Sequence, residues 1–241
     1  VPLIEIVSEP DMRSPEEARA FVETVKSILE YLEICDCKMQ EGSLRADINL
    51  SVRPAGSNIL GTRTEIKNLN SLRSIQRAAE NEAKRQIHEL ENGRKILQET
   101  RRWDDAKGCS YAMRSKEETN DYRYFPEPDM VPVIVDEKWL ESLKATLPEL
   151  PSARKDRYIR EYGIPEYDAG LITSSRHLAD FFEDALKETG NAKAVSNWIM
   201  GDILRILKEK GLEADAIPFP GSYLAQLVSL IDKKTINGTV A

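Results

Sequence analysis

The chain has 241 residues, enough for one large or two ordinary domains, and its 41% hydrophobic and 31% charged residues are typical of a soluble globular protein. No apolar run approaches the roughly 20 residues that a membrane-spanning helix needs. The formal net charge of −7 argues against binding to bulk nucleic acid without regard to sequence, but it permits an RNA partner recognised by shape at a local site.

The amino-terminal residues predict a strand followed by a helix. Residues 1–7, VPLIEIV, form an apolar run with one carboxylate, Glu5, in its middle, and we expect a strand there. Ser14 is the expected N-cap of a helix, Pro15 its first residue, and Glu17 closes a capping box. Apolar residues then recur at helical spacing to about residue 33.

The clearest strand of the sequence is SLRADINLSVR, residues 43–53. Its apolar side chains alternate with Arg45, Asp47 and Asn49, which therefore share the opposite face. A loop over residues 54–60 leads to a second strand, GTRTEIKNL, with Arg63, Glu65 and Lys67 on one face. If the two strands pair as a hairpin, Asp47 lies opposite Lys67 and Asn49 opposite Glu65. A register slip of two residues keeps the same side chains on this face.

The rest of the chain predicts an α+β fold. A long helix capped at residues 68–71 runs to about Asn92, a hairpin follows over residues 97–114, and residues 119–135 form an extended segment interrupted by prolines. Short helical patterns then follow one another, the strongest over residues 174–190 and 191–211. We expect an antiparallel β-sheet cradle with flanking helices in residues 1–147 and an all-helical domain in residues 148–241.

Most common catalytic motifs are absent from the sequence. His88 and His177 lie on separate predicted helices and form neither a metal pair nor a triad base. Cys35, Cys37 and Cys109 are odd in number and lack CxxC spacing, so we expect no disulfide framework and a reducing, cytoplasmic environment. There is no P-loop, GxGxxG or HExxH motif.

The polar face of the two predicted strands remains as the candidate site, and it carries Arg45, Asp47, Asn49, Arg63, Glu65 and Lys67. Mixed carboxylates and cations on one surface suit a Mg²⁺–nucleotide site, in which carboxylate oxygens hold the metal and Lys or Arg meets phosphates. The same pattern also suits a half-exposed sheet stabilised by weak cross-strand ion pairs. Glu5 favours the first interpretation, since a carboxylate within an apolar strand that is buried without a partner would cost several kcal/mol.

A family resemblance adds to this interpretation. The consecutive blocks PLIEIVSEPD, EGSLRADINLSVRP, TEIKNLNS, QETRRWD, DYRYFPEPD, LPELP and SNWIMGD resemble the B subunits of aspartyl/glutamyl-tRNA amidotransferases. In that family the cradle binds ATP and Mg²⁺ and phosphorylates the side-chain carboxylate of mischarged Asp-tRNA(Asn) or Glu-tRNA(Gln). Ammonia from the partner amidase, which is the A subunit, then displaces the phosphate, and a small C subunit completes the complex.

The resemblance also implies roles for individual residues. Glu5, Asp47 and Glu65 are the expected metal ligands, and together with Lys67 they form the expected catalytic set. Arg45 and Lys67 are expected to meet phosphate oxygens of ATP, with Asn49 and Asn68 as polar positioners. The resemblance further implies that an amino-terminal segment with a Glu-x-His ligand pair and a carboxy-terminal, tRNA-binding tail lie outside this chain. We therefore expect the chain alone to lack amide-forming activity.

Alternatives to this interpretation concern the whole chain and its helical part. The chain could instead be a noncatalytic RNA-binding or assembly module in which the polar sheet face is only structural. The archaeal glutamyl-specific paralogue does not fit, because residues 129–151 leave no room for its extra domain. In the helical part, a cluster of basic residues predicts either a solvated helix face or a contact to tRNA phosphates: Arg154, Lys155, Arg157 and Arg160.

Overall fold

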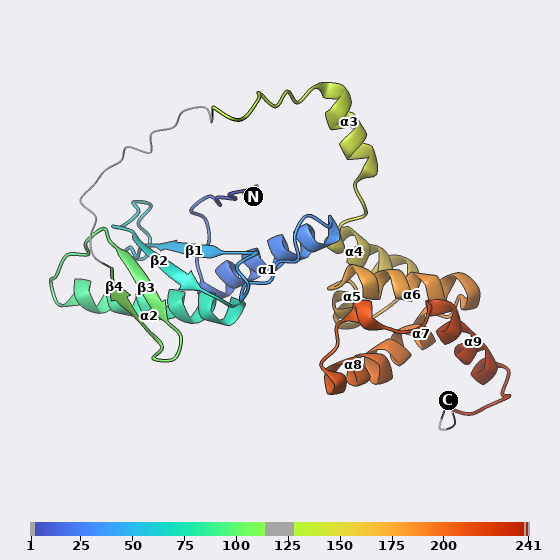
Figure 1. Cartoon of the computed structure of the whole chain (residues 1–241). Coiled ribbons are helices and arrows are strands. Elements are labelled where there is room, and N and C mark those ends of the chain that lie inside the picture. Colours follow the sequence, from blue (N-terminus) through green and yellow to red (C-terminus); the bar gives the residue numbers. More distant parts are fainter. Residues whose placement is uncertain (1–2, 114–127, 239, 241) are drawn as a thin grey trace. The chain divides into compact units, whose positions relative to one another are not determined.

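The computed structural model describes residues 3–113, 128–238 and 240, and the chain divides into two compact units. Unit 1 comprises Val1–Lys26 and Cys35–Glu141, and unit 2 comprises Ser27–Ile34 and Ser142–Ala241 (Figure 1). The predicted boundary after Leu147 differs from this division, which falls between Glu141 and Ser142. Within the described ranges, no helix has the length and apolar character needed to span a membrane.

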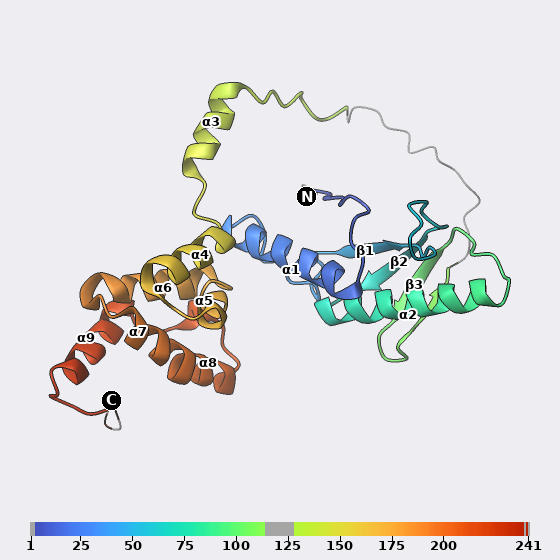
Figure 2. The same cartoon turned by 180° about the vertical axis from the view of Figure 1, so that it is seen from behind.

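Unit 1 is built on a four-stranded sheet in the order β1 (Ala46–Leu50), β2 (Thr64–Leu69), β3 (Thr100–Asp104) and β4 (Cys109–Ala112). Helix α2 (Leu72–Glu91) connects β2 to β3 and packs on one face of the sheet (Figures 1 and 2). The predicted α+β class is confirmed. The prediction of a wholly antiparallel sheet is wrong in one place, because α2 returns the chain so that β2 and β3 run parallel.

The amino-terminal strand prediction is wrong. Residues 3–7 form no strand, and their apolar side chains are exposed, because no strand of the described residues pairs with them. The connection between β1 and β2 covers residues 51–63 rather than 54–60. Within it the chain approaches itself at Gly61, where a Cβ atom would lie 2.2 Å from Val52 O, so that only glycine fits.

The helix and hairpin predictions for unit 1 are confirmed. Helix α1 (Pro15–Tyr31) begins with the Glu17 amide donating to Ser14 Oγ at 3.1 Å. Helix α2 begins with the Ser74 amide donating to Ser71 Oγ at 3.0 Å. Strands β3 and β4 form the predicted antiparallel hairpin. Part of the predicted extended segment 119–135 lies outside the described residues, and residues 128–135 form no strand.

Unit 2 is helical, as predicted. Helix α3 (Glu137–Thr146) spans the division between the units. The elements that follow are α4 (Pro151–Tyr162), α5 (Glu166–Ile172), α6 (Arg176–Thr189), α7 (Ala192–Trp198), a π-helical turn (Ile199–Ile203), α8 (Leu204–Lys210), a 3₁₀ turn (Ala214–Ala216) and α9 (Gly221–Asp232). The core is apolar and includes the fully buried Phe182, Val195 and Ile199. Helix α9 starts so close to α6 that a Cβ on Gly221 would lie 2.4 Å from Phe181 O.

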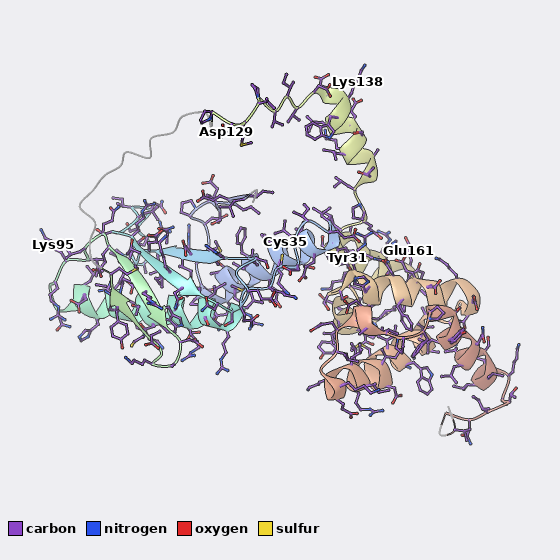
Figure 3. All side chains as sticks on the ribbon, in the orientation of Figure 1. Tyr31, Cys35, Lys95, Asp129, Lys138 and Glu161 are labelled. Carbon is purple, nitrogen blue, oxygen red and sulfur yellow. The ribbon has the colours of Figure 1, made fainter. Side chains whose placement is uncertain are left out.

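The end of α1 belongs to this helical core. Tyr31, labelled in Figure 3, is almost fully buried, and its hydroxyl donates to Thr173 O at 2.7 Å. Arg176 donates to the Tyr31 carbonyl oxygen at 2.8 Å. Burial is the main reason that the pKa of Tyr31 rises to about 12, so the hydroxyl stays protonated and remains a donor.

Candidate functional site

One face of the sheet is polar and open, while the other packs on α2. From Arg45, which directly precedes β1, the exposed Arg45, Asp47 and Asn49 alternate with partly buried Ala46 and Ile48. The predicted division of this strand into an apolar and a polar face is therefore confirmed. We call this open side of the sheet the polar sheet face.

The pairing of β1 with β2 contains a β-bulge at the middle of this face. Asn49 pairs with Glu65 as predicted, but the register shifts between Ala46 and Ile48, so that Asp47 faces both Lys67 and Asn68. Asn68 is the extra residue, and it adopts a left-handed conformation with φ +70°. Its side-chain Nδ2 donates to Trp103 O at 2.9 Å. Because of the bulge, two successive polar side chains, Lys67 and Asn68, stay off the core while Leu69 returns to it.

Lys67 bridges two carboxylates across neighbouring strands. Its Nζ lies 3.2 Å from Asp47 Oδ2 and 3.2 Å from Glu65 Oε1. Partial burial lowers the pKa of Lys67, but the hydrogen bonds to Asp47 and Glu65 outweigh this, and the net pKa is raised. The other carboxylate oxygen of Glu65 accepts from Thr100 Oγ1 at 2.8 Å. The sheet therefore brings together three of the predicted site residues, with a cation held between two anions.

Strands β3 and β4 add residues to this face that the sequence interpretation missed. Thr100 pairs with Glu65 and Arg102 with Lys67 in the parallel ladder, and Tyr111 pairs with Arg102 in the next one. Residues directly opposite one another share a face, so Asp47, Lys67, Arg102 and Tyr111 form one row across the four strands. The alternation within TRRWD, where Trp103 is buried and Arg102 exposed, was the signal that could have identified Arg102.

The structure does not place Glu5 in a group of carboxylates among the described residues. Glu5 is exposed, in a segment without regular structure. Among the described residues, no three His, Cys, Asp or Glu side chains are grouped so that they could hold a metal ion. The structure thus brings Asp47 and Glu65 together through Lys67 but does not add Glu5 to them.

A buried polar network on the α2 side of the sheet holds the strands in place. Glu82 of α2 has a side chain with no solvent exposure, and it accepts hydrogen bonds from Thr64 Oγ1 at 2.7 Å and Arg85 Nη2 at 2.6 Å. Gln86 donates to Glu82 at 2.9 Å and to Leu50 O at 3.1 Å. The network therefore ties α2 to the ends of β1 and β2.

Arg101 extends the network to β3. Its Nε lies 3.5 Å from Glu82 Oε2, and it also pairs with Glu99 and Ser110. Burial raises the pKa of Glu82, but hydrogen bonds from Arg85, Thr64 and Gln86 outweigh it and lower the pKa overall. The carboxylate is therefore ionised and anchors the strands that carry the polar face.

The basic cluster of the helical part is neither a simple solvated face nor an open cationic patch. Arg154 is buried and donates to Asp180 at 2.6 Å and Glu183 at 2.9 Å. Arg157 donates to Glu149 and Glu183. The remaining members are neutralised within the chain as well: Lys155 by Glu166 and Arg160 by Glu161. Each of the four cations therefore has at least one acidic partner within the chain.

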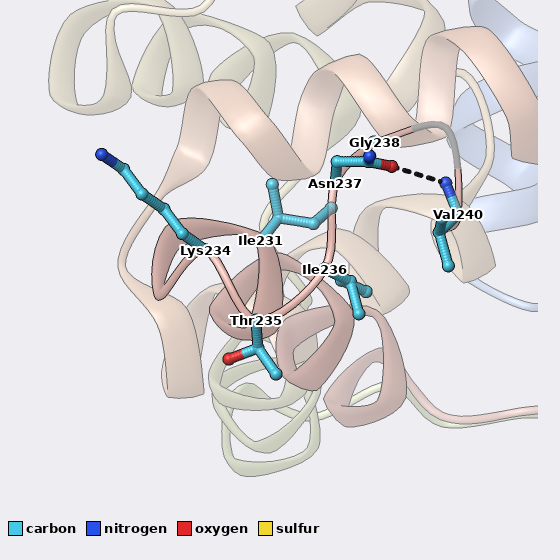
Figure 4. Close-up of a pocket in the computed structure, with 7 residues that line it drawn as sticks. All are labelled: Ile231, Lys234, Thr235, Ile236, Asn237, Gly238 and Val240. Atoms are coloured by element: carbon cyan, nitrogen blue, oxygen red, sulfur yellow. Dashed lines mark hydrogen bonds between the residues drawn. The ribbon is translucent and has the colours of Figure 1, made fainter.

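A shallow hollow lies at the carboxy-terminal end of unit 2. It is lined by Ile231, Lys234, Thr235, Ile236, Asn237, Gly238 and Val240 (Figure 4). The Val240 amide donates to Asn237 Oδ1 at 3.0 Å. Its lining contains one charged side chain, Lys234, and none of the predicted site residues. The candidate site is therefore the polar sheet face of unit 1.

The fold and the site define a two-unit α+β protein with a charged, open sheet face and a helical second unit. Residues 1–141 match the family model described as the GatB/GatE catalytic domain, and residues 180–241 match the model described as the GatB domain. The first match alone covers more than half of the chain, and the chain belongs to the GatB family. The resemblance noted from the sequence is thus confirmed.

Curated relatives are named as the B subunit of aspartyl/glutamyl-tRNA(Asn/Gln) amidotransferase. The relative from Caldicellulosiruptor bescii is 60% identical over 244 residues, which cover all of this chain and 51% of the relative. Those from Thermoanaerobacter pseudethanolicus and Carboxydothermus hydrogenoformans are 57% and 52% identical, again over the whole chain and over 51% and 50% of their own lengths. The chain therefore spans about half the length of the curated relatives it matches.

Proposed function

We propose that this chain is the ATP- and metal-binding part of a B subunit in a glutamine-dependent aspartyl/glutamyl-tRNA(Asn/Gln) amidotransferase. ATP phosphorylates the side-chain carboxylate of mischarged Asp-tRNA(Asn) or Glu-tRNA(Gln), and ammonia displaces the phosphate to form the amide. The ammonia comes from the amidase, or A, subunit, and a small C subunit completes the complex. Family membership and the names of the curated relatives support this proposal.

The observation that carries the proposal is the pair of carboxylates held on one open sheet face. Asp47 and Glu65 come from neighbouring strands, and each lies 3.2 Å from the same ammonium group. Mg²⁺ takes hard oxygen ligands and commonly uses one or two carboxylates, leaving its other positions to phosphates and water. Asp47 and Glu65 fit that donor set and would hold the ion, and Glu5 stays a predicted third ligand.

The cations and amides of the face would receive the nucleotide. Arg45 is exposed directly before β1, two residues from Asp47, and a guanidinium suits phosphate oxygens. Lys67 stays protonated because of its two carboxylate partners, and its third N–H is left for a phosphate oxygen. Asn49 lies beside Glu65 and would position the ligand directly. Asn68 would act through the bulge, since its amide group donates to Trp103 O.

This arrangement suits phosphoryl transfer to a carboxylate. A carboxylate is a poor electrophile at neutral pH, and a phosphate leaving group makes amide formation feasible. Phosphoryl transfer requires positioning and charge neutralisation from the protein rather than covalent chemistry. When bound, Mg²⁺ would orient the phosphates and screen their repulsion from the incoming carboxylate. The residues of the polar sheet face would hold the phosphates and the incoming carboxylate in a fixed relation to each other. The buried Glu82 network supports this, because it anchors the strands that carry these residues.

Substitution of the two carboxylates tests the proposal. Asp47→Asn and Glu65→Gln are introduced into the full-length subunit within its complex, and amidated tRNA is measured with ATP, mischarged tRNA and either glutamine or free ammonia. Both variants should lower turnover at least about 100-fold with either nitrogen source, while glutamine hydrolysis measured separately persists. Glu91→Gln, an exposed carboxylate at the end of α2, is the matched control. Full turnover by both variants would instead support a noncatalytic module.

A further inference from the structure

We infer that Arg102 is an oxyanion-binding residue of the polar sheet face, an inference that rests on the proposed function and adds a residue to it. Arg102 lies at the centre of β3, directly opposite Lys67 on one side and Tyr111 on the other. Neighbouring strands are about 4.8 Å apart. The backbone of Arg102 is thus one strand away from Lys67.

The charge of the bridge itself creates the need for another cation. Asp47, Lys67 and Glu65 together carry a formal charge of −1, because one ammonium is shared by two carboxylates. Two of the three N–H donors of Lys67 are directed to these partners. A triphosphate or carboxylate approaching this face would therefore meet a net negative group unless further cations flank it. Arg102 on β3 lies opposite Lys67, and Arg45 directly precedes β1, two residues before Asp47.

The pleat of β3 separates two adjacent arginines into different environments. The Arg101 side chain is only 12% exposed and is engaged with Glu82, Glu99 and Ser110 beneath the sheet. Arg102 is exposed on the opposite face and makes no hydrogen bond or ion pair within the part of the chain that the structure describes. Arg101 thus has a structural role, whereas Arg102 keeps its donors for a ligand.

The chemistry of the guanidinium indicates the kind of ligand. Its planar fork of N–H donors matches two oxygens of one phosphate or one carboxylate. On the polar sheet face, this oxyanion is either a phosphate of ATP or the side-chain carboxylate of the aminoacyl-tRNA. Both present the same pair of oxygens, and separate kinetic constants distinguish them.

The test uses Arg102→Gln and Arg102→Lys in the full-length subunit within its complex. Arg94→Gln is the matched control, since it removes the same charge from an exposed arginine near the end of α2, away from the polar sheet face. The KM for ATP and the KM for mischarged tRNA are measured separately. Equilibrium dialysis of ATP with the complex gives a binding constant that is independent of turnover.

We expect Arg102→Gln to raise one of the two KM values about tenfold to a hundredfold, the loss of a charged hydrogen bond, with partial recovery in Arg102→Lys. A raised KM and dissociation constant for ATP assign the phosphate, and a raised KM for tRNA alone assigns the carboxylate. If Arg102→Gln matches Arg94→Gln in both constants, the inference fails. If Asp47→Asn is inactive in the same assay, this result overturns only the inference about Arg102, and the proposed function stands. Full activity of both Asp47→Asn and Glu65→Gln would overturn the proposed function itself.

Discussion

Replacing Glu82 by glutamine should strongly destabilise unit 1. The substitution keeps the shape of the side chain but removes its charge and introduces an NH₂ donor. That donor would face Thr64, Arg85 and Gln86, all of which donate to the carboxylate. At least one buried polar group would then lose its partner, and the Arg101 guanidinium would lose a nearby counter-charge.

The expected loss in the free energy of unfolding is about 3 to 5 kcal/mol, the range for removing one partner from a buried charge network. No discount for solvent screening applies to Glu82, because its side chain has no exposure. Arg85, at 26% exposure, can turn toward water, which places the expected loss at about 3 kcal/mol.

The pH dependence of this loss has a definite sign. The folded-state pKa of Glu82 lies below its ordinary value of 4.5. The ionised carboxylate therefore stabilises the fold above pH 4.5, and this stabilisation is lost as the pH falls through the folded-state pKa. The difference between the wild type and Glu82→Gln should be full at pH 7 and should shrink in acid.

Urea unfolding followed by the fluorescence of Trp103 measures this effect. Trp103 is buried in unit 1, and replacing Trp139 and Trp198 by phenylalanine leaves it as the sole tryptophan. Glu91→Gln, an exposed position on the same helix, controls for the loss of a charge and should change the stability by less than about 0.5 kcal/mol. If Glu82→Gln costs no more than the control, the buried network does not anchor the strands and the reasoning is refuted.

Two further predictions concern the bulge and the helical unit. Asn68→Val should cost about 2 kcal/mol, because a β-branched residue is strained at φ +70°. Asn68→Gly should cost less despite losing the bond to Trp103, and equal losses in urea would rule out backbone strain as the cause. In unit 2, burial raises the pKa of Glu183, but hydrogen bonds from Arg154, Arg157 and Tyr158 outweigh it and hold the pKa at about 2, below the ordinary 4.5. Glu183→Gln should therefore cost on the order of 3 kcal/mol at pH 7, and the difference should close as the pH falls from 4.5 towards 2, measured by urea unfolding at several pH values. A loss that does not vary with pH would contradict this cause.

Local patterns predicted most of the helices and strands, and part of the polar sheet face. Alternation along residues 43–53 placed Arg45, Asp47 and Asn49 on one face, because side-chain direction in a strand depends only on position along the chain. Hydroxyl caps at Ser14 and Ser71 predicted the starts of α1 and α2 for a similarly local reason.

Features that depend on distant partners were missed. The parallel pairing of β2 with β3 joins residues separated by the whole of α2, so the place of Arg102 beside Lys67 could not be read from either strand. The run Lys67–Asn68 in TEIKNL breaks the alternation, and this was the available signal for the bulge. The apolar residues 3–7 favoured a strand by composition, but a strand also needs a neighbour. Arg154 was assigned to a surface because charge patterning does not reveal which acids fold against it.

The binding of Mn²⁺ together with ATP to the complete complex tests the central claim most directly. Mn²⁺ has the oxygen preference of Mg²⁺ and is detected by electron paramagnetic resonance, so its free concentration can be titrated without any turnover. We predict that Asp47→Asn and Glu65→Gln each weaken Mn²⁺ binding in the presence of ATP by at least about tenfold, the loss of one charged ligand, while Glu91→Gln leaves it unchanged. Unaltered Mn²⁺ binding by both variants would contradict a nucleotide–metal site on this sheet face.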